Sequence, residues 1–230
     1  MSNPVAPTAP WFHTLSLPDG EITPGSKSAA VLKTEADVVF KHGVAGKSVL
    51  DIGASDGFFS FEAERRGAAK VLATDHFHWS GPGWGNKGGF DYAHARLGSK
   101  IASLDIDVPQ ISPETVGVHD VVLFLGVLYH VKDPLTALAN AASAAGELLV
   151  VETATALDIL PWPVMRFYEG AELANDPTNF WCPNRRCLAG MARELDFKRV
   201  EITRHPLMRP HWRNPDLYWK HSRVVMHAWR

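Results

Sequence analysis

The 230-residue sequence contains only two cysteines, Cys182 and Cys187, and it has no apolar run of membrane-spanning length. Two cysteines without a second pair build neither a disulfide framework nor a zinc motif, so we expect a reducing compartment and no metal. The N-terminus also lacks a basic start and an apolar signal core. We therefore expect a cytoplasmic protein with no membrane partner.

Long basic runs are absent as well, because the positive charges occur in short clusters such as Arg185-Arg186 and Lys198-Arg199. The formal net charge is −2, whereas nucleic-acid-binding domains usually carry a basic face. Folding can still assemble such a face from separate clusters. The charge therefore makes tRNA a less expected partner but does not exclude it. With 46% apolar and 21% charged residues, the chain is globular, as a monomer or a homodimer.

A glycine turn lies within residues 48–60, which read SVLDIGASDGFFS. Val49, Leu50 and Ile52 form the apolar run of a parallel strand that is covered on both faces. Gly53 and Gly57 then bracket a turn in which the backbone comes close to another group. A strand, this turn and a following helix start indicate a nucleotide-like ligand.

The spacing of the two glycines and the acids near them narrow the ligand. Dinucleotide folds prefer G-x-G-x-x-G, so a nicotinamide oxidoreductase is the weakest alternative. Asp51 lies within the end of the strand, where a carboxylate suits a ligand with a cation, as in the sulfonium and ammonium of S-adenosylmethionine. Asp75 ends a second apolar strand, at the place that typically binds ribose hydroxyls.

The rest of the chain alternates strands and helices, which predicts an α/β fold. We expect strands at about 48–52, 70–74, 101–105, 120–125, 148–153, 197–202 and 223–228, and helices at about 28–42, 57–66, 90–98, 134–144 and 185–195. A loose start (1–10), a glycine-rich loop (76–89) and a polar aromatic loop (204–221) interrupt them. We divide the chain into an N-terminal flap and helix (1–44) and a main domain (45–230), which carries an aromatic-rich lid at about 154–184.

Three sets of motifs carry a family resemblance. The turn VLDIGASDG resembles that of class I S-adenosylmethionine-dependent methyltransferases. The stretches WFHT (11–14), GVLYH (126–130) and DPTNFW (176–181) more narrowly resemble the family of a tRNA wobble-uridine (mo5U34) modifying enzyme, also known as DUF1698-like. The resemblance implies a Rossmann-like fold with a seven-stranded, mostly parallel sheet, helices on both faces and an antiparallel last strand. It also implies transfer of a one-carbon group.

The residues then fall into three sets. Cofactor binding is expected of Asp51, Gly53, Ser55, Gly57, Asp75, His76, Asp107, Val108, Leu125 and Gly126, with Asp107 and Val108 meeting the adenine. Catalysis is expected of His130, as the general base, and of Tyr129, which by resemblance lies beside the transferred group. Acceptor binding is expected of Trp11, His13, Lys33, Arg166, Tyr168, Trp181, Asn184 and Arg223.

We conclude from the sequence that the chain is an S-adenosylmethionine-dependent methyltransferase. Its aromatic-rich lid favours a small-molecule acceptor, an aromatic compound or another natural product that is methylated on oxygen or nitrogen. Two alternatives stay open: a tRNA wobble-uridine methyl- or carboxymethyltransferase, and a cofactor-binding protein without catalytic activity.

Overall fold

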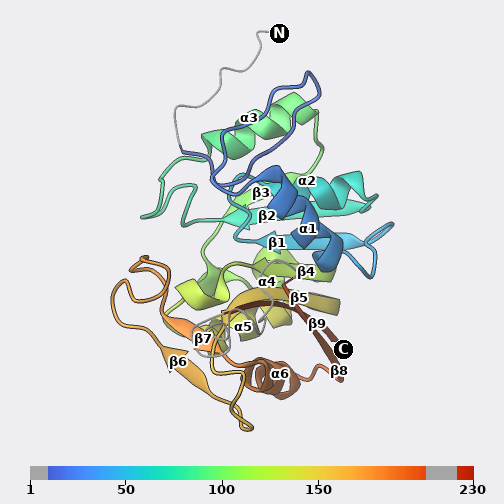
Figure 1. Ribbon diagram of the computed structural model, residues 1–230. Coiled ribbons are helices and arrows are strands. Elements are labelled where there is room, and N and C mark those ends of the chain that lie inside the picture. Colours follow the sequence, from blue (N-terminus) through green and yellow to red (C-terminus); the bar gives the residue numbers. More distant parts are fainter. Residues whose placement is uncertain (1–9, 206–221) are drawn as a thin grey trace. The chain divides into compact units, whose positions relative to one another are not determined.

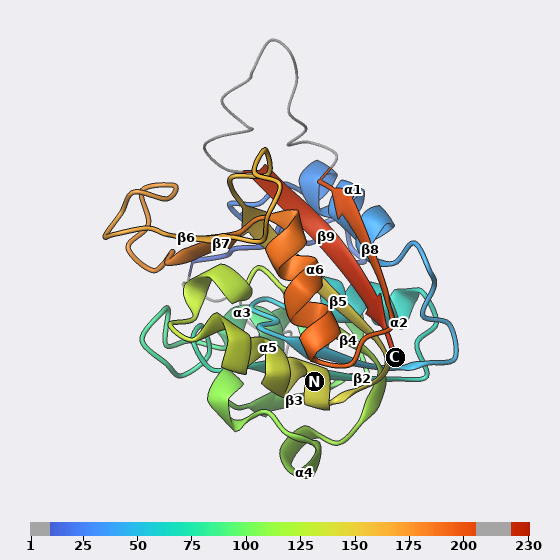
Figure 2. The same cartoon turned by 90° about the horizontal axis from the view of Figure 1, so that it is seen from below.

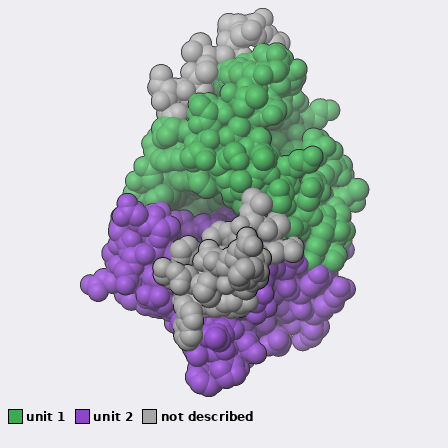
Figure 3. Space-filling model, viewed as in Figure 1, with its two compact units in different colours: residues 1–110 green, residues 111–230 purple. Residues whose placement is uncertain are grey.

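The computed structural model describes residues 10–205 and 222–230, and its chain separates into two compact units, residues 1–110 and 111–230 (Figures 1 and 3). The loose start and the polar loop predicted at 204–221 fall almost entirely outside the described residues. Seven strands form one sheet in the order β3-β2-β1-β4-β5-β9-β8. This arrangement confirms the predicted Rossmann-like, mostly parallel sheet.

Unit 1 alternates strands and helices after an N-terminal segment. Its elements are α1 (Ala29–Val39), β1 (Ser48–Ile52), α2 (Phe58–Arg65), β2 (Lys70–Asp75), α3 (Gly88–Leu97), β3 (Ala102–Asp105) and the 3-10 turn η1 (Val108–Gln110). Strands β1, β2 and β3 pair in parallel. Val49 and Leu50 of β1 are fully buried, as expected of a strand covered on both faces. Ser28 caps α1 by accepting a hydrogen bond from the Val31 amide.

Unit 2 contains the remaining strands of the seven-stranded sheet. Its elements are α4 (Pro113–Val116), β4 (His119–Leu125), the 3-10 turn η2 (Leu128–His130), α5 (Pro134–Ser143), β5 (Ala145–Thr155), β6 (Met165–Phe167), β7 (Trp181–Pro183), α6 (Arg185–Glu194), β8 (Arg199–Arg204) and β9 (Ser222–Trp229). Strands β4 and β5 pair in parallel, whereas β9 runs antiparallel to both β5 and β8. The antiparallel last strand matches the expectation.

The region 154–184 contains more regular structure than the sequence predicted. Strands β6 and β7 form a separate antiparallel pair, in which Phe167 lies opposite Trp181 (Figure 2). Three-residue strands between prolines give too short an alternation to be recognised from the sequence. Tyr168, which follows β6, and Cys182 of β7 pack in a small buried cluster with Ala154, Ala156 and Leu173.

The two cysteines and the lengths of the helices can be compared with the expectations from composition. Cys182 is buried and Cys187 is partly buried, and neither is in a disulfide. Within the described part of the chain, no helix combines the length and the hydropathy needed to cross a membrane.

Candidate active site

The glycine turn of unit 1 has an unusual backbone. Gly53 and Gly57 have φ angles of 82° and 87°, and Ser55 between them has a φ of 51°. A left-handed conformation is uncommon for serine, and strained residues of this kind cluster at functional sites. The amides of Gly53 and Ala54 both donate to the carbonyl oxygen of Thr74, at 2.8 and 3.0 Å, and so fix the turn against β2.

Asp51 is a buried carboxylate at the end of β1. Its Oδ2 accepts a 2.6 Å hydrogen bond from the Ser60 hydroxyl of α2, and its side chain is 2% exposed. Burial and, to a smaller extent, the negative charge of Asp75 raise the pKa of Asp51 to about 7, against the opposing effect of the Ser60 hydrogen bonds. Among the described residues, no cationic side chain contacts this carboxylate.

Asp75 ends β2 and organises the turn. Its Oδ2 accepts from the Ser55 amide at 2.8 Å, and its Oδ1 accepts from the His78 amide at 2.9 Å. The His78 ring in turn lies 2.8 Å from the Ser55 hydroxyl and stacks on Trp84, with 4.2 Å between the ring centroids. Each carboxylate oxygen retains a second lone pair, so these bonds leave Asp75 able to accept a ribose hydroxyl.

These features fit the predicted cofactor. A buried carboxylate with a raised pKa is costly unless a positive charge approaches it, and S-adenosylmethionine carries an ammonium and a sulfonium. The other residues predicted for cofactor binding divide between the two units. Unit 1 contains His76, which follows β2, and Asp107 and Val108, which follow β3. Unit 2 contains Leu125, the last residue of β4, and Gly126, which follows it.

Residues predicted to meet the adenosine are only partly buried. The His76 ring lies 2.9 Å from Asp105, whose hydrogen bond raises the pKa of His76. Asp107 is exposed, and its carboxylate accepts from the Val108 amide at 2.8 Å. Phe77, which the sequence analysis did not select, exposes 44% of its surface directly after His76. An aromatic residue that follows the predicted second strand is visible in the sequence and could have been selected on that basis.

The N-terminal segment forms a strap over residues 10–28, held to the turn by Asp56. The Asp56 Oδ2 accepts from the amides of Phe12 and His13 at 2.7 and 2.8 Å, and burial raises the pKa of Asp56 to about 6. His13 is buried against the rings of Phe58 and Phe59, and this burial lowers its pKa well below the usual value. Sequence reasoning missed Asp56 as an anchor, although an acid inside a glycine turn was visible.

Trp11 and Lys33, both predicted to bind the acceptor, occupy different environments. Trp11 is buried, and its ring meets the edge of Tyr92 of α3 with centroids 6.2 Å apart. Its carbonyl oxygen accepts from the Ser26 amide. Lys33 is exposed on α1. The structure therefore gives Trp11 a packing role in unit 1 and brings Lys33 into no cluster with the other predicted residues of that unit.

We expect Gly25→Ala to destabilise the strap, because the added Cβ would lie 2.1 Å from the carbonyl carbon of His13. Overpacking of this kind costs about 1–3 kcal/mol of unfolding free energy. Gly190→Ala is the matched control: it lies within α6 with open space around it, and alanine in a helix is favoured by up to about 1 kcal/mol. Urea denaturation followed by circular dichroism should show the two changes with opposite signs. Equal stabilities for the two variants would contradict the close approach at Gly25.

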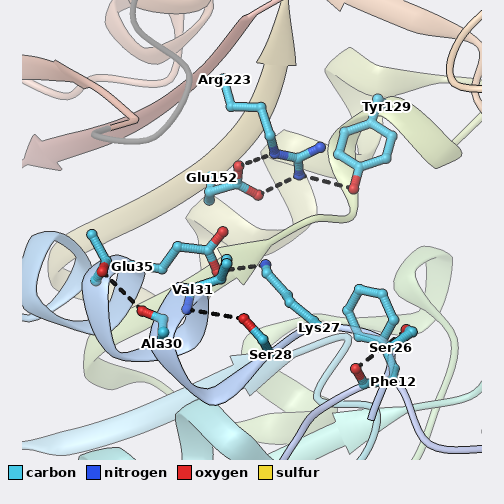
Figure 4. A network of polar contacts seen from close by, with 11 residues as sticks. Phe12, Ser26, Lys27, Ser28, Ala30, Val31, Glu35, Tyr129, Glu152 and Arg223 are labelled. Atoms are coloured by element: carbon cyan, nitrogen blue, oxygen red, sulfur yellow. Dashed lines mark hydrogen bonds and ion pairs between the residues drawn. The ribbon is translucent and has the colours of Figure 1, made fainter.

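Unit 2 holds a cluster built by Arg223 of β9, Glu152 of β5 and Tyr129 of η2 (Figure 4). Arg223 donates through Nε and Nη2 to the two Glu152 oxygens, at 2.6 and 2.7 Å, and through Nη2 to the Tyr129 hydroxyl at 2.9 Å. Burial would lower the pKa of Arg223, but the Glu152 carboxylate raises it well above its usual value. The guanidinium is therefore held charged, and it orients the Tyr129 ring.

Gly126 lies beside this cluster. Its amide donates to the Glu152 carbonyl oxygen at 2.9 Å, and a Cβ at this position would lie 3.4 Å from the Tyr129 hydroxyl. The sequence therefore places a glycine where Tyr129 passes close to the backbone after β4. Tyr129 and Arg223 were both predicted to belong to the site, and the structure adds that they are in contact. Glu152 was not selected from the sequence.

His130 follows Tyr129, and the centroids of the two rings lie 4.3 Å apart. Its Nδ1 lies 3.0 Å from both the carbonyl oxygen and the hydroxyl of Thr178. The candidate base is thus tied to the segment that precedes β7. Whether it accepts a proton in the reaction stays a prediction.

The other predicted acceptor residues of unit 2 differ in accessibility. Asn184 is fully buried; its Oδ1 accepts from the Cys187 amide and caps α6, and its Nδ2 donates to the Trp162 carbonyl oxygen. Arg166 lies over the Tyr168 ring at 4.2 Å. Trp181 lines a shallow pocket of about 250 Å³ together with Lys132, Phe167 and Phe180. The polar atoms of Asn184 are thus engaged by the protein's own backbone, whereas the partly buried Trp181 borders this pocket.

Among residues 10–205 and 222–230, no three histidine, cysteine, aspartate or glutamate side chains are grouped so that they could hold a metal ion.

Comparison with known proteins identifies the class. Residues 29–202 match the family described as methyltransferase domain, and because the match covers most of the chain, the protein belongs to this family. No curated protein sequence matches the chain significantly. The family match confirms the prediction that the chain is a methyltransferase, and the fold agrees with it.

Three solved structures illustrate the shared fold. The N-terminal domain of EvdMO1, crystallised in the presence of SAH and D-fucose, has a TM-score of 0.69 and 18% identity, over 96% of this chain and 91% of that chain. A 1,6-didemethyltoxoflavin N1-methyltransferase from Burkholderia thailandensis has a TM-score of 0.61 and 18% identity, over 87% and 78%. Magnesium protoporphyrin IX methyltransferase from Synechocystis PCC 6803, with bound SAM, has a TM-score of 0.58 and 15% identity, over 87% and 78%.

Proposed function

We propose that the protein transfers a methyl group from S-adenosylmethionine to an oxygen or ring nitrogen of a small, aromatic or otherwise polar natural product. The observation that carries the cofactor half of this proposal is Asp51, a buried carboxylate without a cationic partner among the described residues, beside a turn with three positive φ angles. The acceptor half is supported by the similar structures, of which one was solved with D-fucose and another with 1,6-didemethyltoxoflavin.

Residues of each unit have a separate part in this proposal. Bound S-adenosylmethionine supplies an electrophilic methyl group on its sulfonium. In unit 1, the turn at residues 53–57 and the acids Asp51 and Asp75 hold and orient the cofactor. In unit 2, Tyr129 lies beside the acceptor, and Arg223 fixes the direction of its hydroxyl. Alignment of the reacting atoms supplies much of the rate in such a displacement.

A phenol or ring N–H must also lose its proton as it attacks the methyl group. We assign this proton to His130, because the ordinary pKa of histidine lies close to neutral pH. General base catalysis typically contributes about 10²- to 10⁴-fold. The methyltransferase family match does not test the narrower resemblance to the tRNA enzymes, which stays a prediction. A lid at residues 154–184 and a domain boundary at residue 44 also stay predictions.

The test begins with thermal unfolding in the presence of S-adenosylmethionine, S-adenosylhomocysteine, the carboxylated cofactor or NADH. A ligand at one hundred times its Kd adds about 2.7 kcal/mol, which is a shift of several degrees. We expect the first two ligands to raise the Tm and NADH to leave it unchanged. A larger shift with the carboxylated cofactor would favour the tRNA alternative.

The acceptor is tested with trideuteromethyl-labelled S-adenosylmethionine, a panel of phenols and nitrogen heterocycles, and bulk tRNA. Mass spectrometry of the products should show the label in a member of the panel. Label in tRNA alone would overturn the small-molecule acceptor, and cofactor binding without label in either pool would favour the non-catalytic alternative.

A further inference from the structure

The segment before β7 presents an aspartate and a threonine to His130. The Asp176 Oδ1 accepts hydrogen bonds from the Thr178 hydroxyl at 2.7 Å and from the Thr178 amide at 2.8 Å. These bonds contribute to a lowered pKa of Asp176, opposing the effect of burial. The Thr178 hydroxyl then lies 3.0 Å from the His130 Nδ1. A carboxylate, a hydroxyl and an imidazole therefore form a continuous chain of hydrogen bonds in unit 2.

The directions of these bonds determine where the His130 proton sits. The Thr178 carbonyl oxygen has no hydrogen and can only accept. The Thr178 hydroxyl hydrogen is directed to Asp176, so its oxygen also offers only lone pairs to His130. Both partners of Nδ1 are thus acceptors, which requires a hydrogen on Nδ1 and leaves the basic lone pair on Nε2 in the neutral ring.

The same arrangement also favours the protonated ring. When Nε2 takes up a proton, the positive charge spreads to Nδ1, which faces a carbonyl oxygen and, through one hydroxyl, a carboxylate. The negative charge of Asp176 and the positive charge of protonated His130 stabilise each other, as the effect of His130 on Asp176 also indicates. Serine hydrolases use a carboxylate for this purpose through a direct bond to histidine. Here a threonine hydroxyl is interposed.

We propose that Asp176 and Thr178 are positioning residues that fix the tautomer of His130, so that Nε2 takes the proton that the acceptor loses when its oxygen or nitrogen bonds to the methyl carbon. The catalytic use of this arrangement rests on the proposed function, but the tautomer itself does not. Asp176 and Thr178 are the first and third residues of the motif DPTNFW, which thereby has a chemical role in addition to its family resemblance.

The test is nitrogen NMR of the full chain labelled at histidine, with His130→Asn to assign the signals of that residue among the eleven histidines. At pH 8, we expect the wild type to show a protonated Nδ1 and an unprotonated Nε2. Asp176→Asn frees the Thr178 hydroxyl to donate to Nδ1, so we expect the other tautomer to become populated. The pKa of His130 should also fall by about one unit, because a carboxylate charge is lost.

Two variants of Thr178 distinguish hydrogen bonding from packing. Thr178→Val keeps the size but removes the hydroxyl, and we expect it to lower the pKa of His130 as Asp176→Asn does. Thr178→Ser keeps the hydroxyl and should restore the wild-type spectrum and pKa. If wild-type His130 carries its proton on Nε2, or if Asp176→Asn and Thr178→Val leave both tautomer and pKa unchanged, the proposal is overturned.

Activity gives the readout that a structural role would not move. With the phenol methylated fastest in the screen above, Asp176→Asn should lower kcat at little change in KM and move the acid limb of the pH profile down by the same unit. S-adenosylhomocysteine binding, measured in parallel, separates the two failures. Wild type that does not bind it contradicts the proposed function, whereas intact binding with an unmoved pH profile contradicts only the role of Asp176.

Discussion

Arg223→Ala is expected to lower the free energy of unfolding by about 3–5 kcal/mol, because it leaves the Glu152 carboxylate without the guanidinium that neutralises it. Glu152 is 4% exposed and lies in the middle of β5, between β4 and β9. Water therefore solvates the Glu152 carboxylate poorly once the guanidinium is removed. For a domain of this size the loss corresponds to roughly 6–20 °C in Tm, and thermal denaturation followed by circular dichroism measures it.

The pH dependence identifies the cause. Without Arg223, a buried Glu152 is expected to take up a proton more readily, so the variant should recover part of its stability as the pH falls towards 5. Adding Glu152→Gln to Arg223→Ala removes the buried charge and should recover stability at pH 8 as well, which a double-mutant cycle quantifies. Arg199→Ala, an exposed arginine of β8, is the control and should have a small effect. Wild-type stability of Arg223→Ala at pH 8 would contradict the pairing.

Asp51→Asn is expected to weaken the binding of S-adenosylmethionine and S-adenosylhomocysteine by about 10- to 100-fold, since it removes one charge-assisted interaction with the cofactor's cationic end. Asparagine keeps the size of the side chain and can still accept from Ser60. Isothermal titration calorimetry measures the affinity, and Asp37→Asn, an exposed aspartate of α1, provides the matched control. Equal affinity of Asp51→Asn and wild type would remove Asp51 from the cofactor site.

The raised pKa of Asp51 adds a dependence on pH with a definite sign. In the folded protein its pKa is about 7, above the ordinary value of 3.8, so between these values the folded state holds a proton that the unfolded state has released. Relative to Asp51→Asn, the wild type should lose stability as the pH rises from 4 to 7 and stay level above 7. Cofactor affinity should instead rise through pH 7 in the wild type, where Asp51 ionises, and this step should be missing in Asp51→Asn.

Some features of the fold were predictable because each has a local cause. The run of Val49, Leu50 and Ile52 before the turn at Gly53 determines β1, and the same logic of short apolar strands gave the order of the seven strands along the chain. Strand ends were less predictable: β5 spans Ala145–Thr155 rather than 148–153. Its additional residues pair with β4 and β9, and those partners are not visible in the local pattern.

The acids at strand ends were easier to predict from the sequence than the residues that hold other side chains in place. Asp51 and Asp75 end strands, so their positions follow from the strand pattern. Glu152 and Asp176 were missed as partners because their contacts join residues far apart in the sequence or depend on the direction of a hydroxyl. The Tyr129–Arg223 contact is also of this kind, since the two residues are separated by 94 positions, and only the family resemblance anticipated that both belong to the site.

The position of β9 in the sheet imposes an order on assembly. Strand β8 precedes β9 in the sequence, but in the sheet β9 lies between β5 and β8. The paired residues of β5 and β9 are 67 positions (Thr155 and Ser222) to 81 positions (Leu148 and Trp229) apart in the sequence. Closing so long a loop is a slow event in folding. Until it happens, β5 and β8 each present an open edge on which another copy of the chain can add a strand. A chain cut before Ser222 would keep both edges open permanently and would also lack Arg223, so aggregation should accompany its loss of stability and activity.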